Sequence, residues 1–196
     1  MNNVILPKRL LPAFNAMITK PKLGGYTPRE LVSVKYTLLT LIPELKSGLG
    51  MRQGPHHIHD VFNHTISTMV KTPPKLHLRL AALFHDIGKP LTETGQYSDI
   101  HFLGHEKVGA EMTKKIMTRL GYSPKLTDKV SHLVKHHLIG YSPSWSNRAV
   151  NRFERRVGRE NIRDLFILNR ADSLAKTEEI DRYRLMRQEL GARLGI

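Results

Sequence analysis

The chain has 196 residues, of which 40% are hydrophobic, and it contains no cysteine. This length suits a single domain with a substantial core, and the lack of cysteine excludes disulfides and thiolate metal ligands. Lysine and arginine number 31 against 17 aspartate and glutamate residues, which gives a formal net charge of +14. Such a charge favours encounters with polyanions such as RNA or nucleotides, although a solvated basic surface would have the same composition.

The sequence gives no sign of a membrane protein. No run approaches the roughly 18 consecutive apolar residues that a membrane span needs. Residues 1–14 lack the long uncharged stretch of a signal peptide. We therefore expect a cytoplasmic protein without membrane contact.

Helical periodicity begins near the N-terminus, over residues 12–20 and 27–50, with Thr27 as an N-cap. A loop over 51–59 then precedes a helix that Asp60 can cap. Residues 75–88 are strongly apolar, with Leu76, Leu80 and Leu83 at the spacing of a buried helical stripe.

The pattern breaks over residues 92–102, a polar stretch around Gly95 that indicates a small hairpin or an ordered loop. Periodicity resumes over 104–121, 123–140, 146–158 and 159–190. The last segment is too long for one uncapped helix and is expected to break near 176–178. We predict an all-α bundle of about eight or nine helices, with at most a small hairpin near 92–102.

His85 and Asp86 stand at the end of the most apolar helix, where an unpaired polar group is costly. A divalent metal would satisfy both through an imidazole nitrogen and a carboxylate oxygen, and a capped pair without metal is the alternative. Other helices also direct histidine or aspartate toward the same interior: His64, His105, Asp172 and one of His136 and His137. Helical phase favours His137 as the inward member of its pair.

The chain resembles the HD superfamily of metal-dependent phosphohydrolases in five segments: HDVFNHT at 59–65, LFHDIGKP at 83–90, GHEKVGAE at 104–111, LVKHHL at 133–138 and NRADSLA at 169–175. More narrowly, it looks like the HD domain that follows the catalytic and RNA-binding parts of bacterial CCA-adding tRNA nucleotidyltransferases. The resemblance covers residues 41–188, so we interpret 1–196 as a single HD domain in which 1–40 is an N-terminal helical extension.

The resemblance implies a set of metal ligands. It assigns His64, His85, Asp86 and Asp172 to a first metal site, in which Asp86 can bridge to a second metal. His105 and His136 or His137 match the second site; motif alignment favours His136, and we keep both residues with a preference for His136. One or two divalent ions, of Mn, Fe, Ni, Co or Zn, suit imidazole and carboxylate ligands.

The resemblance also implies hydrolytic chemistry at Asp86 and Lys89, with Lys89 contacting substrate phosphate. The expected activity is 2′,3′-cyclic phosphodiesterase on nucleotides or RNA ends, with nucleotidase or phosphatase activity beside it. Hydrolysis of deoxynucleoside triphosphates or cyclic dinucleotides is an alternative, and a non-catalytic RNA-binding or regulatory module is an alternative of another class. No paired-carboxylate motif for nucleotidyl transfer occurs, so we expect the hydrolytic module to stand alone.

Arginines recur at spacings of three or four in the C-terminal half, and Gly158 interrupts the series. They are Arg148, Arg152, Arg155, Arg156, Arg159 and Arg163. An RNA or nucleotide phosphate track and a solvated arginine face are the two interpretations of this series. Arg148 and Arg152 are the arginines that we name as candidate contacts to substrate phosphate.

Overall fold

A computed structural model describes residues 10–20, 26–54, 58–95, 99–176 and 180–196. Within these ranges the chain forms nine α-helices and no strand. The all-α prediction and the expected helix number are therefore confirmed. None of the described helices combines the length and the apolar character that a membrane span requires. At the expected hairpin the described residues make one isolated antiparallel bridge, between Thr94 and His101; residues 96–98 lie outside the described part.

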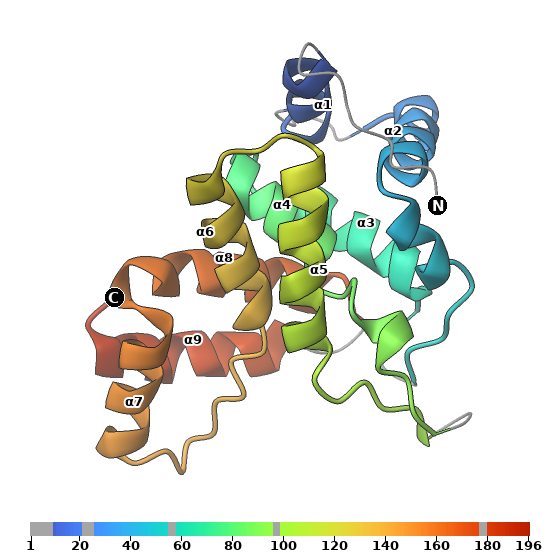
Figure 1. Cartoon of the computed structure of the whole chain (residues 1–196). Coiled ribbons are helices and arrows are strands. Elements are labelled where there is room, and N and C mark those ends of the chain that lie inside the picture. The colour runs from blue at the N-terminus through green and yellow to red at the C-terminus, as the bar shows by residue number, and fades with distance from the viewer. Residues whose placement is uncertain (1–9, 21–25, 55–57, 96–98, 177–179) are drawn as a thin grey trace.

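Two helices form the N-terminal region, α1 (Leu11–Ile18) and α2 (Pro28–Leu41), followed by the short 3-10 helix η2 (Pro43–Gly48). Thr27 and Glu30 form a capping box at the start of α2, so the expected cap is present. Phe14, Ile18 and Leu38 belong to the same buried apolar cluster as the helices that follow. The described part of the extension thus packs on the rest of the bundle (Figure 1).

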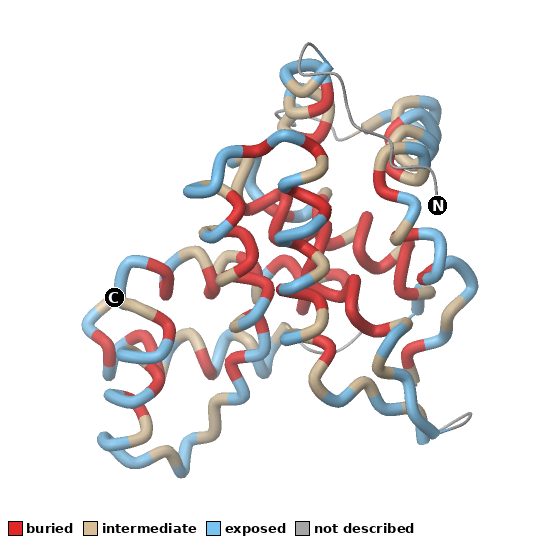
Figure 2. The backbone as a smooth tube through the Cα atoms, in the orientation of Figure 1, coloured by how far each residue is buried: buried red, intermediate tan, exposed pale blue. Residues whose placement is uncertain are grey.

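Helix α4 (Leu76–Phe84) lies at the centre of the bundle, and every residue from Leu78 to Phe84 is buried. It contacts α3 (Val61–Lys71), α6 (Pro124–Lys135) and α8 (Arg159–Leu174), with α5 (His105–Arg119) beside them. Figure 2 shows the buried backbone concentrated in this central set of helices. Burial on all sides explains why the α4 sequence is apolar almost throughout.

The predicted C-terminal breaks are confirmed. Helix α7 (Asn147–Val157) is separated from α8 by Gly158, whose positive φ of 80° is a conformation that glycine adopts without strain. Helix α8 ends at Leu174 and α9 (Ile180–Leu194) begins beyond residues 177–179, which lie outside the described part. The arginines of α7 are therefore not continuous with Arg159 and Arg163 of α8.

Candidate metal centre

The end of helix α4 places His85 and Asp86 beside the start of helix α5. Helix α4 ends at Phe84, and the next turn leads into the 3-10 helix η3 (Lys89–Leu91). A Cβ atom on Gly88 would clash with the carbonyl oxygen of His105 and lie 2.7 Å from the backbone nitrogen of Gly109. Glycine at position 88 therefore lets this turn approach α5 closely enough to bring His105 to Asp86.

The first group consists of His64 from α3, His85 after α4 and Asp172 from α8, all buried, with their ligand atoms within 4.8 Å of one another. The Nε2 atom of His64 lies 2.9 Å from Oδ1 of Asp172 and 3.4 Å from Nε2 of His85. The Nε2 atom of His85 lies 3.6 Å from the same carboxylate oxygen.

The second group consists of Asp86, His105 and His137, which are also buried and have ligand atoms within 4.8 Å of one another. The Nε2 atoms of His105 and His137 are 3.3 Å apart. Oδ1 of Asp86 lies 3.4 Å from the first and 3.8 Å from the second.

Asp86 has one oxygen beside each group. Its Oδ2 lies 3.1 Å from Nε2 of His85 and 3.6 Å from Nε2 of His64, whereas Oδ1 faces the second group. Burial alone would raise the pKa of the Asp86 carboxyl. The charges of His85 and Lys89 outweigh this effect and hold the pKa well below its usual value. The bridging position expected for Asp86 is therefore geometrically available.

The tautomers of the second group suit a metal ion. Nδ1 of His105 donates to the carbonyl oxygen of Phe102 at 2.6 Å, and Nδ1 of His137 donates to that of Val134 at 2.7 Å. Since a neutral imidazole carries one N–H, both Nε2 atoms present lone pairs to each other. Backbone acceptors that fix the tautomer in this way are typical of metal-binding histidines.

The electrostatics of the two groups differ. Burial, with the charge of His85, lowers the pKa of His137 to about 3, so this imidazole is neutral, as metal ligation requires. Burial alone would also lower the pKa of His85. The carboxylates of Asp86 and Asp172 outweigh this effect and raise the pKa to about 9. The two carboxylates thus favour a positive charge at the first group. This donor set fits one or two divalent ions.

The structure places His137, and not His136, in the second group, so our preference for His136 is corrected. Helix α6 ends at Lys135, and the His136 ring lies 4.6 Å from the ring of His132 instead. Burial and the neighbouring charges of His132, Arg156 and Lys135 lower the pKa of His136 to about 4. Helical phase indicated the inward residue correctly, whereas motif alignment did not.

Lys89 lies beside the metal groups, next to Asp86. Its Nζ lies 2.8 Å from Oδ2 of Asp86 and 2.7 Å from Oε1 of Gln53, and it lies over the Phe102 ring. An ammonium group has three N–H donors, so one remains for a ligand beside the metal groups.

Two cavities adjoin the metal groups. The first, which we call the basic pocket, has a volume of about 650 Å³. Its charged and imidazole side chains are Lys89, His101, His105, Glu106, Lys107, Lys135, His136 and Arg156. Arg148 and Arg152 are exposed on α7 and do not line it; Arg156, farther along the same helix, does.

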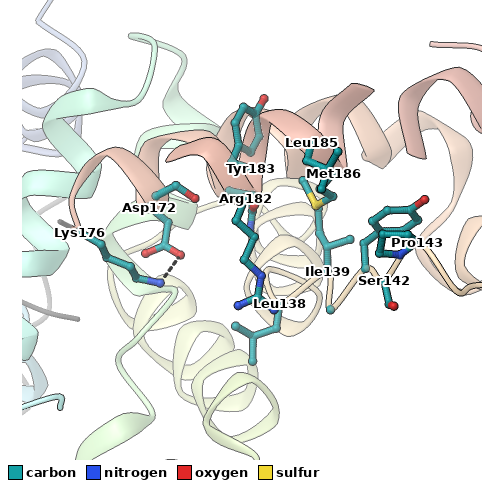
Figure 3. Close-up of a pocket in the computed structure, with 14 residues that line it drawn as sticks. Leu138, Ile139, Ser142, Pro143, Asp172, Lys176, Arg182, Tyr183, Leu185 and Met186 are labelled. Atoms are coloured by element: carbon teal, nitrogen blue, oxygen red, sulfur yellow. Dashed lines mark hydrogen bonds and ion pairs between the residues drawn. The ribbon is translucent and has the colours of Figure 1, made fainter. Parts of the chain in front are cut away.

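The second cavity, the α8–α9 pocket, has a volume of about 630 Å³ and includes Asp172 and Lys176 (Figure 3). Lys176 lies 3.0 Å from Oδ2 of Asp172. Sequence reasoning missed Gln53, which lies in a loop without a motif. It also missed Lys176, although its spacing of four residues from Asp172 on a predicted helix was a usable signal.

Comparison with known proteins identifies the domain family of this chain. The family model for the HD domain matches residues 58–177. A Deinococcus radiodurans A-adding tRNA nucleotidyltransferase is 36% identical over 159 residues, which cover 74% of this chain and 35% of that protein. A Thermus thermophilus CC-adding tRNA nucleotidyltransferase is 35% identical over 144 residues, covering 68% and 32% of the two chains.

A third relative shares a shorter segment. A Mycobacterium tuberculosis bifunctional uridylyltransferase/uridylyl-removing enzyme is 37% identical over 90 residues, which cover 42% of this chain and 10% of that protein. The chain thus spans about a third or less of the length of these three relatives. The chain belongs to the HD-domain family, which is part of a superfamily of metal-dependent phosphohydrolases.

Proposed function

We propose that this protein hydrolyses phosphate esters of nucleotides or RNA ends, with 2′,3′-cyclic phosphodiesters as the preferred substrates and nucleotidase or phosphatase activity beside them. One relative carries uridylyl removal in its name, and a uridylyl group is attached through phosphate. Two relatives are tRNA nucleotidyltransferases, which is consistent with a substrate that is an RNA end.

One observation carries this proposal: two His/Asp groups share the carboxylate of Asp86 at the edge of a pocket rich in cations. Cleavage of a phosphate ester needs an activated water and neutralisation of negative charge on the phosphoryl oxygens. The complete ligand groups favour a catalytic role over the non-catalytic alternative.

The mechanism assigns roles to residues of this chain. His64, His85 and Asp172 would hold one divalent ion and His105, His137 and Asp86 another; such ions lower the pKa of water and stabilise charge on phosphate. Asp86 presents one carboxylate oxygen to each group. Lys89 donates its remaining N–H to a non-bridging phosphate oxygen, and Gln53 keeps the ammonium group in place.

Exclusion of bulk water strengthens these interactions. The metal-group residues and Lys89 are all less than 10% exposed, and a low local dielectric increases the attraction between the fixed charges and a phosphate. Lys107, Lys135 and Arg156 of the basic pocket attract the phosphates of the substrate toward this centre.

The deciding experiment is a substrate screen of the metal-loaded protein. The panel contains 2′,3′-cyclic nucleotides, an RNA oligonucleotide ending in a 2′,3′-cyclic phosphate, nucleoside monophosphates, deoxynucleoside triphosphates and cyclic dinucleotides. We expect the cyclic phosphates to give the highest kcat/KM. Activity only on triphosphates or cyclic dinucleotides would replace the proposed substrate class, and RNA binding without hydrolysis would establish the non-catalytic alternative.

The variant Asp86→Ala tests the site within this screen. It removes the carboxylate that has one oxygen beside each group. We therefore expect metal affinity and kcat/KM each to fall by more than about a hundredfold, a larger loss than is usual when a residue that only hydrogen-bonds to a metal ligand is replaced. Asp128→Ala, which removes an exposed carboxylate of α6, is the matched control and should keep full activity. Full activity in Asp86→Ala would contradict the proposal.

A further inference from the structure

The two cavities adjoin different metal groups. Asp172 of the first group lines the α8–α9 pocket, whereas His105 of the second group lines the basic pocket. Leu138 lines both. A phosphate held between the two metal groups would therefore lie next to both cavities.

The chemistry of the two cavities is unequal. The basic pocket has four Lys or Arg side chains against one carboxylate, Glu106. The α8–α9 pocket has an apolar wall of Leu138, Ile139, Leu185 and Met186. The first cavity suits phosphates, and the second suits a group with a large uncharged surface.

Polar side chains also line the α8–α9 pocket. Asn169 and Tyr141 line it, and the charge of Lys176 is already paired with Asp172. Arg182 extends from α9 toward Leu138 in Figure 3. A planar guanidinium beside an apolar wall is a suitable stacking surface for a nucleobase, and an amide side chain can hydrogen-bond a base edge.

We propose that the α8–α9 pocket binds the nucleoside of the substrate, between Arg182 and the wall formed by Leu138, Leu185 and Met186. The volume of about 630 Å³ falls within the range of small-molecule sites. This inference rests on the proposed function: the phosphate of the terminal nucleotide lies at the metal groups, its base lies in the α8–α9 pocket, and any further phosphates lie in the basic pocket.

Leu185→Glu tests the pocket, because Leu185 lines it, is 48% exposed and belongs to neither metal group. The matched control is Leu49→Glu, at a leucine that is 47% exposed and lines neither cavity. We expect Leu185→Glu to raise KM for 2′,3′-cyclic AMP by roughly tenfold, the loss expected when one base contact is removed. Leu49→Glu should leave this KM unchanged.

A binding measurement separates this inference from the proposed function. Trp145 is the only tryptophan of the chain, and its ring lies 5.5 Å from that of Tyr141, which lines the α8–α9 pocket. Titration with adenosine should change Trp145 fluorescence saturably, whereas inorganic phosphate should not. Leu185→Glu should weaken the adenosine response by roughly tenfold, and Leu49→Glu should not.

The possible results distinguish the two proposals. Hydrolysis of 2′,3′-cyclic AMP with equal KM, and an equal adenosine titration, in Leu185→Glu and wild type would overturn the nucleoside pocket and leave the phosphohydrolase intact. Absence of any hydrolysis by the metal-loaded wild type would overturn the proposed function, and the adenosine titration would still decide whether the pocket binds a nucleoside.

Discussion

At the scale of single residues, the buried carboxylate of Asp86 is stable as an anion only because cationic or hydrogen-bonding groups surround it. The Nζ atom of Lys89 lies 2.8 Å and Nε2 of His85 3.1 Å from Oδ2. Taking a carboxylate out of water without such partners costs several kcal/mol. The same arrangement that neutralises Asp86 gives it one oxygen for each metal group.

The neighbours His136 and His137 provide a residue-scale prediction. We expect His137→Ala to lower the bound metal by about one ion per chain, because the second group loses a neutral imidazole. His136→Ala, at the adjacent position, should retain the full metal content. Elemental analysis after metal loading and desalting, with circular dichroism to establish folding, makes the comparison. Equal loss in both variants would contradict the assignment.

Gly88 and Gly109 provide a second pair, on opposite sides of one backbone contact. Gly88→Ala should destabilise the protein by about 1–3 kcal/mol, because its Cβ would clash with the α5 backbone and the turn or helix must shift. In Gly109→Ala the new atom would lie 3.4 Å from its nearest neighbours, an ordinary contact. That variant should be neutral or slightly stabilising, since alanine favours helix. Urea denaturation of both measures the difference.

At the scale of elements, the ligands are held by helices that pack on α4, and polar contacts fix those helices relative to one another. Asp164 of α8 is one such contact: its Oδ2 lies 3.2 Å from Nε2 of His77 on α4 and 2.6 Å from Nζ of Lys129 on α6. Burial raises the pKa of Asp164, but these two partners outweigh it and lower the pKa to about 2.

This lowered pKa predicts a pH dependence of stability. Because the folded-state value lies below the usual 3.8, the ionised carboxylate stabilises the fold above about pH 4, and that contribution is lost as the pH falls toward the folded-state value. Asp164→Asn should cost about 1 kcal/mol at pH 7. The difference in urea midpoint between wild type and variant should shrink between pH 4 and pH 2; a constant difference would rule out this role.

At the scale of the whole molecule, metal binding should stabilise the fold, because the ligands come from helices distant in the sequence and meet only in the folded state. With a divalent ion at a hundred times its Kd, we expect the melting temperature to rise by about 5–10 °C. A chelator should reverse the rise. Calorimetry of wild type and Asp86→Ala tests this expectation, since the variant should respond little to added metal.

Part of the fold and the site followed from local patterns in the sequence. The apolar period of residues 75–84 predicted a buried helix, Thr27 and Asp60 predicted caps, and Gly158 predicted a break; each depends on side chains and backbone within one segment. The inward phases of His64, His105 and Asp172 likewise follow from their own helices, and the phase of α6, continued past its end at Lys135, also indicated His137. Local periodicity is sufficient for such features because a helix fixes the directions of its side chains.

Local patterns predicted the helical class and most of the histidines and aspartates that face the core, but left His136 and His137 as alternatives. Helix packing was needed to show that His137 joins the second group, that His136 turns toward His132, and that Gln53 supports Lys89. It also decided that Arg156 lines the basic pocket while Arg148 and Arg152 do not. These outcomes depend on how separate helices pack, because contacts between residues far apart in the sequence carry no local periodic signal.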